Sequence, residues 1–544
     1  MRPFLTLHQP ALARRHYAAG LWRDETLHDL LAAHAAARPD AVCARDGRRT
    51  LTWVQFAAWV DGVATQLRGL GLTQGDAVSL WMSNRLEAVA TFLACSREGF
   101  ACNPSLHRTH TSGEIVRLLG QLGTRVLVTE PGWGADRVAD PVARFAAAAP
   151  SLAAVLTPDG FPGPGAAPPK PDSDPDRIVY LAFTSGSTGA PKCVMHSDNT
   201  LLANARDLVR DWGHGPQTRI LTLSPLSHHI AWVAVAQWLV AGGLLVVDDP
   251  PPGTSRLDWL LANEATYVLG VPTHAMDMLA EQHARGLPRL GSVRAFYMAG
   301  APIPPAVAEA FVAQGIAPQN VYGMTENSSH HYTHPDDPTD TIIASCGRGG
   351  RAYEVAIFDP NDRDRRLGPG EVGEIGGRGA ALMLGYLANQ EATAAGFNRD
   401  GWFLSGDLGA LDERGNLTIK GRTKDLIIRG GHNIHPSHIE ALAVRHPAVQ
   451  RAAALAVPDE RLGEKVCLAI IGDVAPDALL AHLAAEGLSR YDMPEYMLAM
   501  ASFPLTASGK VLKREIAAML ERGELTPVPV RYRPDATMQN RETV

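Results

Sequence analysis

Apolar residues recur along the first part of the chain in two alternating patterns. Helical spacing of these residues predicts helices over Leu27–Ala36 and Val54–Leu70, whereas short apolar runs predict buried strands at Ala77–Met82 and Thr124–Val128. The same alternation resumes between residues 201 and 345. Strands that alternate with helices indicate layered α/β architecture with parallel pairing. The pattern therefore predicts a large N-terminal α/β domain.

The pattern changes twice toward the C-terminus. Between residues 350 and 425, short strands and glycine turns predict a β-rich region with more antiparallel pairing. From about residue 426, the predicted elements are two helices and two strands: helices at Pro436–Arg445 and Asp477–Glu486, and strands near 451–457 and 465–471. They predict a compact α+β unit within the usual size range of a domain.

Composition is typical of a globular protein that works in a reducing compartment. Of the 544 residues, 46% are hydrophobic and 20% are charged. A net charge of −7 with a pI near 6.3 argues against a general nucleic-acid binder. The six cysteines contain no C-x-x-C pair, so we expect no structural zinc and a cytoplasmic location.

One uncharged segment, Ile230–Val247, is long enough to be weighed as a membrane span. Gly242 and Gly243 divide it into a predicted helix, Ile230–Ala241, and a predicted strand, Leu244–Val247. We therefore expect a buried helix and strand, with no membrane insertion.

The most informative stretch is an apolar run, Ile178–Phe183, followed by the polar loop Thr184–Lys192. The loop holds four hydroxyl side chains, two glycines and a lysine. Glycines let backbone N–H groups turn inward, hydroxyls add donors and lysine adds positive charge, which together suit a polyphosphate. It is not a Walker loop, because Pro191 precedes the lysine and Cys193 follows it. An ordinary polar surface loop is the alternative.

The loop resembles the phosphate-binding motif of the adenylate-forming enzymes, the ANL superfamily, which includes acyl-CoA synthetases and aryl-AMP ligases. In these enzymes the pattern is [ST]-[SG]-G-[ST]-[ST]-G-x-P-K-G, and only Cys193 departs from it. The resemblance implies a phosphate site formed by Thr184, Ser185, Gly186, Ser187, Thr188, Gly189 and Lys192, with Thr188 also acting in catalysis.

A second motif, Y-G-x-T-E, follows an apolar run and contains Tyr322, Gly323, Thr325 and Glu326. In isolation it is a capped turn, although a tyrosine can stack on a purine and a carboxylate can hold Mg²⁺. The resemblance implies that Tyr322 and Gly323 lie against adenine, that Thr325 reaches a phosphate and that Glu326 binds the metal.

Two further motifs complete the expected nucleotide site. The turn Gly300, Ala301, Pro302 resembles the one that borders adenine and the acyl pocket in this superfamily. Asp407 lies in S-G-D-L-G and Arg422 in G-R-T-K-D. The resemblance implies that Asp407 and Arg422 bind the ribose, whereas a lone G-D-x-G is usually only a β-turn.

The C-terminal motifs imply a mobile domain. Lys424 matches the hinge residue between a large domain, residues 1–423, and a small domain, residues 424–544. Gly430 and Gly431 resemble the loop that lines the pantetheine tunnel, where His432 replaces a common glutamate. Lys510, in T-A-S-G-K, resembles the lysine that reaches the α-phosphate during adenylation.

The acyl pocket is the least explicit part of the sequence. Pro225-Leu226-Ser227-His228 resembles the superfamily's P-[LM]-x-H motif. The resemblance implies that His228 lies beside the bound carboxylate and takes part in catalysis. The expected pocket residues are His228, His229, Trp232, Thr273 and Met324. A zinc site at His330, His331 and His334 is a weak alternative, because no cysteine or acid follows at the right interval.

The resemblance implies an AMP-forming acyl-CoA ligase with ATP, Mg²⁺ and coenzyme A as cofactors and a small carboxylic acid as substrate. His16–Trp22 and the G-G-H-N-I sequence at 430–434 are most similar to the cyclohexanecarboxylate-type ligases. An alicyclic, aromatic or medium-chain acid is expected, in that order. The sequence leaves homodimer formation and the identity of the acid open.

Two alternatives remain. One is a stand-alone aryl- or acyl-AMP ligase that loads a carrier protein. The other is a non-catalytic nucleotide- or acyl-binding relative, which Cys193 favours. The presence of the expected functional side chains argues against lost activity: Thr188, Lys192, Glu326, Asp407, Arg422 and Lys510.

Overall fold

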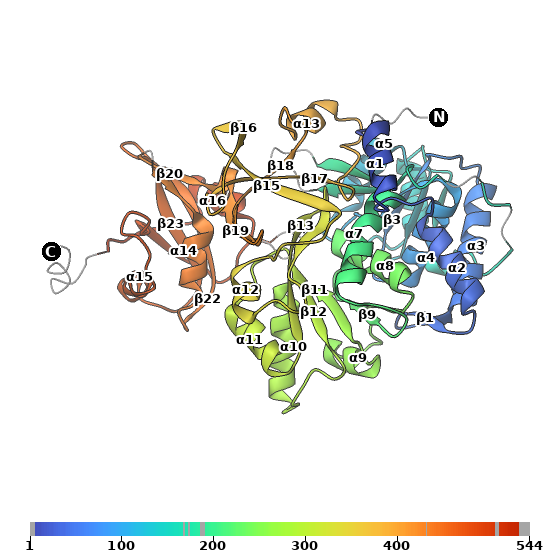
Figure 1. Cartoon of the computed structure of the whole chain (residues 1–544), viewed down its shortest axis with the longest axis horizontal. Helices are drawn as coiled ribbons and strands as arrows, with labels where there is room; N and C mark the ends of the chain where they lie inside the picture. Colours follow the sequence, from blue (N-terminus) through green and yellow to red (C-terminus); the bar gives the residue numbers. More distant parts are fainter. Residues whose placement is uncertain are drawn as a thin grey trace. The chain divides into compact units, whose positions relative to one another are not determined.

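The structure is a computed structural model (Figure 1) that describes residues 6–166, 169–171, 174–184, 191–430, 432–505 and 511–532. Its backbone divides into two compact units. The large unit contains residues up to 355 together with 377–403 and 412–418, and the small unit contains 356–376, 404–411 and the chain from 419 onward.

The large unit contains an eight-stranded sheet. Its strands, in spatial order, are β14 (Ser328–Tyr332), β13 (Ala317–Met324), β12 (Ala295–Ala299), β11 (Tyr267–Gly270), β9 (Arg219–Thr222), β10 (Leu244–Val247), β1 (Val42–Arg45) and β2 (Thr50–Thr52). From β13 to β1 every neighbouring pair is parallel, and the two outermost pairs, β13–β14 and β1–β2, are antiparallel. The predicted parallel α/β layering is confirmed.

A six-stranded sheet forms the other half of the large unit. Its strands, in spatial order, are β6 (Ala154–Leu156), β5 (Val126–Thr129), β3 (Ala77–Trp81), β4 (Ala101–Asn103), β7 (Ile178–Thr184) and β8 (Lys192–Ser197). All pairs are parallel except the β7–β8 hairpin. The apolar run Ile178–Phe183 lies in β7, and the polar loop of the phosphate motif joins β7 to β8.

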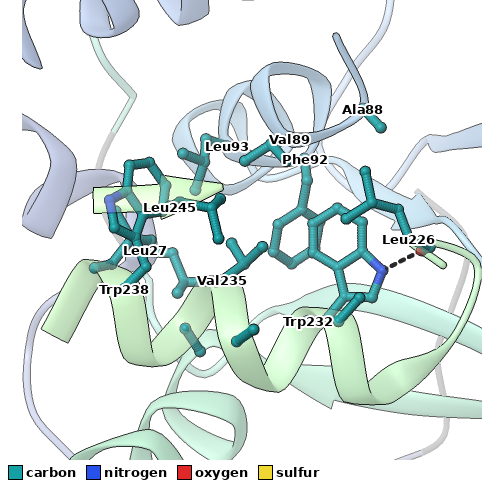
Figure 2. Packing of buried hydrophobic residues seen from close by; sticks show 14 of the residues in the cluster. Leu27, Ala88, Val89, Phe92, Leu93, Leu226, Trp232, Val235, Trp238 and Leu245 are labelled. Carbon is teal, nitrogen blue, oxygen red and sulfur yellow. Dashed lines mark hydrogen bonds between the residues drawn. The ribbon is translucent and has the colours of Figure 1, made fainter. Parts of the chain in front are cut away.

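Helices cover both faces of each sheet. The largest hydrophobic core draws side chains from both sheets and from the helices between them: α2 (Leu27–Ala37), α3 (Trp53–Gly69), α4 (Leu86–Glu98), α7 (Asp198–Asp211) and α8 (His229–Ala241). Trp53 and Trp238 stack there with ring centroids 5.1 Å apart. Figure 2 shows the part of this core around Trp232 and Trp238.

The outer faces have separate apolar clusters. Beside the six-stranded sheet lie α5 (Ser112–Leu122) and α6 (Pro141–Ala148), and beside the eight-stranded sheet lie α9 (Arg256–Ala262), α10 (Pro272–Ala284) and α11 (Pro305–Ala313). The remaining helices of the large unit are α1 (Pro10–Ala18), α12 (Thr339–Ala344), α13 (Gln390–Ala395) and the 3₁₀ turn η1 (Pro158–Gly160). The large unit is therefore a five-layer α/β structure.

Residues 230–247 form a helix and a strand, as their glycines predict. α8 ends at Ala241, and its C-cap Gly242 has a φ of +68°, the left-handed conformation that favours glycine at a helix end; β10 follows. Among the described residues, none of the helices combines the length and the apolar character that a membrane span requires.

The small unit contains the C-terminal α+β fold. Its sheet has the order β21 (His432–Ile434), β20 (Ile427–Arg429), β23 (Gly463–Gly472), β24 (Tyr496–Ala499), β25 (Val528–Pro529), and β22 (Val449–Asp459) also pairs with β23. One apolar cluster packs α14 (Pro436–Ala443) and α15 (Pro476–Ala485) on this sheet, and a second packs α16 (Lys513–Glu521).

A five-stranded sheet precedes this fold along the chain. Its strands, in order, are β16 (Asp362–Arg366), β15 (Tyr353–Asp359), β17 (Gly373–Gly379), β18 (Phe403–Leu411) and β19 (Leu417–Arg422), and the 3₁₀ turn η2 (Thr423–Asp425) follows. β15 and β16 pair antiparallel, as the short strands and glycine turns of residues 350–425 predict.

Asp198, the first residue of α7, is a buried carboxyl group inside the large unit. Its Oδ1 accepts hydrogen bonds from the Leu27 backbone N–H and the Ser96 hydroxyl, both at 2.8 Å. Burial is the main cause that raises the pKa of Asp198 from 3.8 to about 7. The stability linked to this proton is fully present below pH 3.8 and is lost as the pH rises through about 7.

We predict that Asp198→Asn makes the protein less sensitive to rising pH, because asparagine keeps an acceptor oxygen and has no proton to lose. Between about pH 5 and about pH 8, the wild type should lose on the order of 2 kcal/mol more unfolding free energy than the variant. Urea denaturation at both pH values measures this difference. Asp140→Asn, at the exposed N-cap of α6, is the control. Equal pH dependence of wild type and Asp198→Asn contradicts the assignment.

Candidate functional site

Four of the predicted site segments follow four neighbouring parallel strands of the eight-stranded sheet. His228 and His229 follow β9, Thr273 follows β11, Gly300–Pro302 follow β12, and Tyr322–Glu326 end β13. Parallel neighbours have their carboxyl ends at the same edge of the sheet, and ligands of open α/β sheets bind at that edge. The fold therefore brings together motifs that are far apart in the sequence.

The Tyr322–Glu326 turn is closed by the β13–β14 hairpin. A side chain at Gly323 would place its Cβ 1.7 Å from the Ser328 carbonyl oxygen, so only glycine fits there. Tyr322 lies edge-on to His330, with ring centroids 5.3 Å apart. The Thr325 carbonyl accepts a hydrogen bond from His196 Nε2 at 2.6 Å. The turn that carries Thr325 and Glu326 is thus fixed by its neighbours.

Glu326 is held by a second chain segment. Its carboxylate Oε1 accepts a hydrogen bond from the Tyr386 hydroxyl at 3.0 Å, and its backbone carbonyl accepts one from Met383 N–H at 2.7 Å. Met324, one of the predicted pocket residues, packs in the same apolar cluster as Tyr386. Burial first, and the Glu326 carboxylate second, raise the pKa of Tyr386. Glu326 is 9% exposed, so its carboxylate reaches the surface of the unit only narrowly.

This carboxylate fits a magnesium ion that is bound mainly through substrate phosphates. Mg²⁺ commonly takes one or two protein carboxylates and completes its shell with phosphate oxygens and water. Within the part of the chain that the structure describes, no three histidine, cysteine, aspartate or glutamate residues form a metal-ion group. Among the described residues, an ion at Glu326 would therefore need ligands from the substrate or from water in addition to the protein.

The residues 185–190 of the phosphate loop lie outside the described residues, so Ser185, Gly186, Ser187, Thr188 and Gly189 stay predictions. The two ends of the loop are described: Thr184 on β7 pairs with Lys192 on β8.

Cys193, the residue that departs from the motif, pairs with Phe183, and its thiol side chain lies in an apolar cluster. Cys193 is 6% exposed, and burial raises its pKa. The cysteine that departs from the motif is therefore a core residue of β8.

The loop that carries His228 is fixed from three sides. Asn84 Oδ1 accepts a hydrogen bond from Leu226 N–H at 2.8 Å, and Trp232 Nε1 donates to the Leu226 carbonyl at 2.6 Å (Figure 2). Ser227 Oγ lies 3.0 Å from His107 Nδ1, and the His107 ring stacks on His228 at 4.5 Å. These contacts fix His228 at the start of α8.

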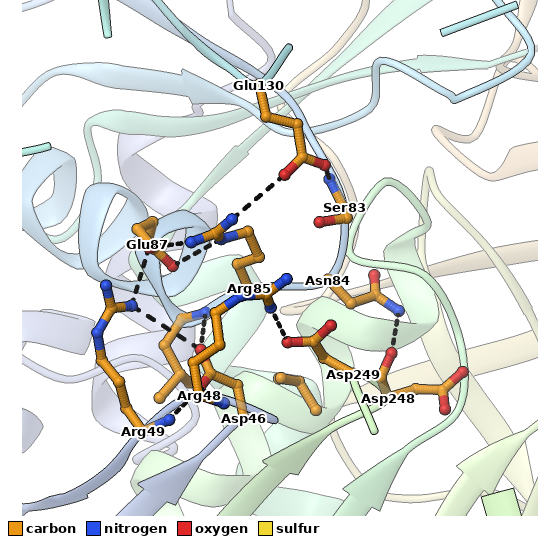
Figure 3. A network of polar contacts seen from close by, with 12 residues as sticks. Asp46, Arg48, Arg49, Ser83, Asn84, Arg85, Glu87, Glu130, Asp248 and Asp249 are labelled. Carbon is orange, nitrogen blue, oxygen red and sulfur yellow. Dashed lines mark hydrogen bonds and ion pairs between the residues drawn. The ribbon is translucent and has the colours of Figure 1, made fainter. Parts of the chain in front are cut away.

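Asn84 joins this loop to a network of charged residues (Figure 3). Its amide donates to the Asp248 carbonyl oxygen at 3.1 Å. Beside it, Arg85 binds Glu87 at 2.9 Å and Glu130 at 3.4 Å. Asn84 thus links the His228 loop to the chain segment that carries these ion pairs.

The predicted acyl-pocket residues differ in how deeply they lie. Trp232 is buried in the core against Phe92, so its contact with the site is through the Leu226 carbonyl. Thr273 is exposed in the first turn of α10. Gly300, Ala301 and Pro302 form an exposed turn in which Gly300 has a φ of +87°. Their roles in binding an acyl group stay predictions.

Burial lowers the pKa of two histidines at this edge, His229 and His107. His229 lies 3.1 Å from the Tyr180 hydroxyl through Nδ1 and 3.0 Å from Ser328 Oγ through Nε2. Burial first, and His196 second, lower the pKa of His229 to about 3. Burial likewise lowers the pKa of His107 to about 3, with His228 and then His110 as the smaller causes. The side of the site around His228 therefore offers uncharged imidazole donors and acceptors.

The three histidines considered for zinc have other partners. His330 Nδ1 and His331 Nδ1 lie 3.1 Å apart, and burial lowers the pKa of both rings. His334 Nε2 lies 2.9 Å from the Gly349 carbonyl oxygen. In the described structure these rings pack with Tyr322, Tyr353 and Tyr332 rather than converge on one point.

The predicted ribose residues lie together in the small unit. Arg422 Nε, on β19, donates to Asp407 Oδ1, on β18, at 2.9 Å. Thr423 Oγ1 donates to the Gly406 carbonyl at 3.1 Å, and Gly406 has a φ of +76°. The bridging contacts hold the Asp407 turn against the end of β19.

The predicted hinge residue, Lys424, comes two residues after Arg422 in the chain. Lys424 lies in η2, where burial first and Arg422 second lower its pKa. Gly430 adopts a φ of +58° and donates its N–H to Leu462 at 2.7 Å. His432 Nε2 lies 2.7 Å from Asp492 Oδ1. Gly431 and Lys510 lie outside the described residues.

Three residues of this arrangement were missed by sequence reasoning: Asn84, His107 and Tyr386. Each acts on a predicted residue from a distant segment, and the local pattern around each one is that of an ordinary strand end, loop or turn. Within the L-G-Y sequence at 384–386, only the glycine is a local signal, since it predicts a turn next to Tyr386. In the structure Gly385 has a φ of +112°.

Comparison with known proteins agrees with this geometry. The AMP-binding enzyme family matches residues 31–387, and the AMP-binding enzyme C-terminal domain matches residues 438–510. The chain belongs to the AMP-binding enzyme family. The first match covers the strands and loops that carry Lys192, His228 and Glu326.

Curated relatives extend over nearly the whole chain. A salicylyl-CoA synthase/salicylate adenylyltransferase of a Streptomyces species is 31% identical over 532 residues, which cover 93% of this chain and 95% of that protein. A sulfoacetate–CoA ligase of Cupriavidus necator is 32% identical over 509 residues, which cover 90% of this chain and 97% of that protein.

Solved structures have the same fold. ATP-bound MatB from Rhodopseudomonas palustris superimposes with a TM-score of 0.81 at 27% identity, and covers 91% of this chain and 99% of its own. The o-succinylbenzoate CoA synthetase of Bacillus subtilis, in complex with its acyl-adenylate intermediate, gives a TM-score of 0.79 at 25% identity, with coverage of 90% and 97%.

We predict that Cys193→Gly lowers the stability of this family member. The change removes a packed thiol side chain from the apolar cluster and adds backbone freedom to β8, for a combined loss of about 1–3 kcal/mol of unfolding free energy. Denaturant unfolding measures the loss. Cys193→Ala is the matched control, because it removes the thiol and leaves a β-carbon, so it should cost less than the glycine variant. A stable Cys193→Gly protein with greatly increased activity would instead identify Cys193 as an attenuating residue.

Proposed function

We propose that this protein is an AMP-forming acyl-CoA ligase. Membership of the family, relatives that are CoA ligases and the arrangement of the site support this assignment. The observation that carries it is the position of Lys192 and Glu326, which come from distant segments and both contact Tyr386 beside the sheet edge where the other predicted motifs end. A cation and a metal-binding carboxylate in this relation suit a magnesium–polyphosphate substrate.

The first half-reaction forms an acyl adenylate. A carboxylate oxygen of the acid attacks the α-phosphorus of ATP, the bond between the α-phosphorus and the bridging oxygen breaks, and pyrophosphate leaves. In this proposal Lys192 and Thr188 bind phosphate oxygens, Thr325 contacts a phosphate, and Glu326 holds Mg²⁺. The ion neutralises phosphate charge when it is bound.

The remaining nucleotide contacts are assigned to the other motifs. We assign Tyr322 to adenine, with Gly323 and the Gly300–Pro302 turn beside it, and we assign Asp407 and Arg422 to the ribose hydroxyls. Lys510 would place its ammonium group at the α-phosphate. Positioned charge of this kind contributes several kcal/mol to stabilising a transition state.

The second half-reaction makes the thioester. The thiol of coenzyme A loses its proton, its sulfur attacks the carbonyl carbon of the acyl adenylate, and the bond to AMP breaks. We propose that the C-terminal domain, residues 424–544, rotates about Lys424 against residues 1–423 between the two steps, which withdraws Lys510 and brings Gly430 and Gly431 to the pantetheine. Binding and positioning therefore carry most of the catalysis.

The neutral histidines limit the class of acid. His228 is assigned to the substrate carboxylate, and the rings of His107 and His229 have pKa values of about 3. Uncharged imidazoles cannot balance a second negative charge on the substrate. We therefore propose a monocarboxylic acid with an uncharged alicyclic, aromatic or medium-length acyl part.

The cellular setting follows from the cysteines. All six are free thiols and all are buried: Cys43, Cys95, Cys102, Cys193, Cys346 and Cys467. Free thiols are typical of a reducing compartment, so we propose a cytoplasmic location.

We predict CoA-dependent turnover of ATP to AMP and pyrophosphate. Pyrophosphate release should be measured with Mg²⁺ over cyclohexanecarboxylate, benzoate, salicylate, octanoate, sulfoacetate and o-succinylbenzoate, each with and without CoA. Uncharged monocarboxylates should be turned over at least about tenfold faster than the two dianions, since one unpaired buried charge costs more than 1.4 kcal/mol.

Three other outcomes would change the assignment. A burst of one turnover that CoA does not extend would favour the alternative in which a carrier protein is the acceptor. Fast turnover of a dianion would contradict the proposed acid class. No turnover with any acid would favour a non-catalytic nucleotide- or acyl-binding protein.

We predict that Lys510→Ala separates the two half-reactions. Acyl-adenylate formation should fall roughly 10²–10³-fold, because a positioned charge at the α-phosphate is lost. Thioester formation from a supplied acyl adenylate should persist, since that step does not use the lysine. Lys513→Ala is the control, because the Lys513 ammonium group pairs with Glu440 instead. Unchanged adenylation in Lys510→Ala would contradict the mechanism.

A further inference from the structure

Residues 383–387 form an added edge beside β8. Met195 N–H donates to the Gly385 carbonyl at 3.0 Å, Leu384 N–H donates to the Met195 carbonyl at 2.8 Å, and Leu387 N–H donates to the Cys193 carbonyl at 2.7 Å. Val194 and Tyr386 form an antiparallel bridge in the middle of this pairing. The backbone of Tyr386 is therefore fixed to the strand that begins with Lys192.

The same segment also holds Glu326. Met383 N–H binds the Glu326 carbonyl, and the Tyr386 hydroxyl binds the Glu326 carboxylate. On its other side, Tyr386 N–H donates to Thr393 Oγ1 at 3.0 Å, which further limits movement of the residue. With 6% of its surface exposed, Tyr386 has little freedom to leave this position.

The ring of Tyr386 makes a separate contact with Lys192. The Lys192 ammonium nitrogen lies 4.8 Å from the ring centroid, which is the geometry of a cation–π interaction. One tyrosine thus holds a cation with its face and an anion with its hydroxyl. Within the described residues, Lys192 contacts this ring rather than a carboxylate, so its charge stays available for a ligand.

We propose that Tyr386 is a positioning residue that sets the relative placement of Lys192 and Glu326 for magnesium–ATP. The inference rests on the proposed function, since it assigns those two side chains to phosphate and metal. Tyr386 acts through both of them: its hydroxyl donates to Oε1 of Glu326 and so orients that carboxylate. Its ring holds Lys192 away from the opposite charge, which would otherwise attract it directly.

Two substitutions separate the roles of the hydroxyl and the ring. Tyr386→Phe removes the hydroxyl and keeps the ring face, whereas Tyr386→Leu removes both. The measured quantity is the affinity for the α,β-methylene analogue of ATP, by calorimetry on the full-length protein with and without Mg²⁺. This analogue cannot be cleaved at the bond that breaks in adenylation, so binding is observed without turnover.

We predict that Tyr386→Phe reduces the Mg²⁺-dependent gain in analogue affinity about tenfold, because a hydrogen bond to a charged group is lost. Its affinity without Mg²⁺ should stay near that of the wild type. Tyr386→Leu should also weaken binding without Mg²⁺, since Lys192 loses its support. Wild-type Mg²⁺ dependence in both variants would overturn the inference.

A double-mutant cycle tests whether the hydroxyl acts through Glu326. On the Glu326→Gln background, adding Tyr386→Phe should change the Mg²⁺ dependence little further, because the charged partner is already absent. Full and independent losses from the two substitutions would instead show that Tyr386 acts elsewhere. Thermal unfolding of each variant reports any change in stability separately.

Tyr332→Phe is the matched control. The Tyr332 hydroxyl donates to Asp211 Oδ2 at 2.7 Å, so this substitution also removes a buried tyrosine–carboxylate hydrogen bond in the large unit. It should lower stability and leave analogue affinity unchanged. A wild-type protein that does not bind the analogue would contradict the proposed function itself, whereas wild-type binding with unchanged Tyr386 variants would contradict only this inference.

Discussion

The backbone pairing between residues 383–387 and β8 is the interaction on which the phosphate side of the site depends. β8 begins at Lys192, where the phosphate loop ends, and its free edge would be open without this added segment. An unpaired edge leaves backbone donors and acceptors without partners and lets a strand shift. Because Met383 also binds the Glu326 backbone, the same pairing fixes the position of Glu326, the proposed metal ligand, relative to the lysine.

The two sides of the site have different electrostatic character. Near Tyr386, a lysine and a glutamate provide the charges that a magnesium–polyphosphate requires. Around His228, burial keeps the imidazole rings neutral, as for His107 and His229. A charged phosphate side and an uncharged acyl side suit a reaction that joins a triphosphate to a carboxylate whose remaining part is apolar or weakly polar. Asn84, the chain neighbour of Arg85, joins the His228 loop to the Asp248 carbonyl, because it accepts from Leu226 N–H and donates to Asp248.

Much of the fold could be predicted from local pattern. The strand at Leu244–Val247 has the predicted ends, because it is a short apolar run bounded by a glycine turn and by aspartates. α7 begins at Asp198, because Ser197 caps the helix and forms a capping box with Thr200. The segment 158–177 has the composition of an exposed connector. Its described part is nevertheless attached to α3, where Trp59 Nε1 donates to the Pro162 carbonyl.

Some residues of the candidate site could be predicted from local sequence motifs, and others could not. His228, Tyr322, Glu326, Asp407 and Arg422 lie in short motifs whose chemistry is readable from neighbouring residues. Asn84, His107 and Tyr386 could not be found in that way, since each contacts a residue of another segment across the fold. Their importance depends on sheet order and on the close passage of two chain segments, which no local pattern contains.

In the proposed mechanism the carboxylate of the substrate attacks the α-phosphorus of ATP, and AMP later leaves the acyl group. Mass spectrometry of the nucleotide product, after turnover of an acid labelled with ¹⁸O in its carboxylate, distinguishes this route from others. We expect AMP that carries one labelled oxygen, transferred when the thiol cleaves the acyl–oxygen bond. Unlabelled AMP, or a labelled phosphate together with ADP, would rule the mechanism out.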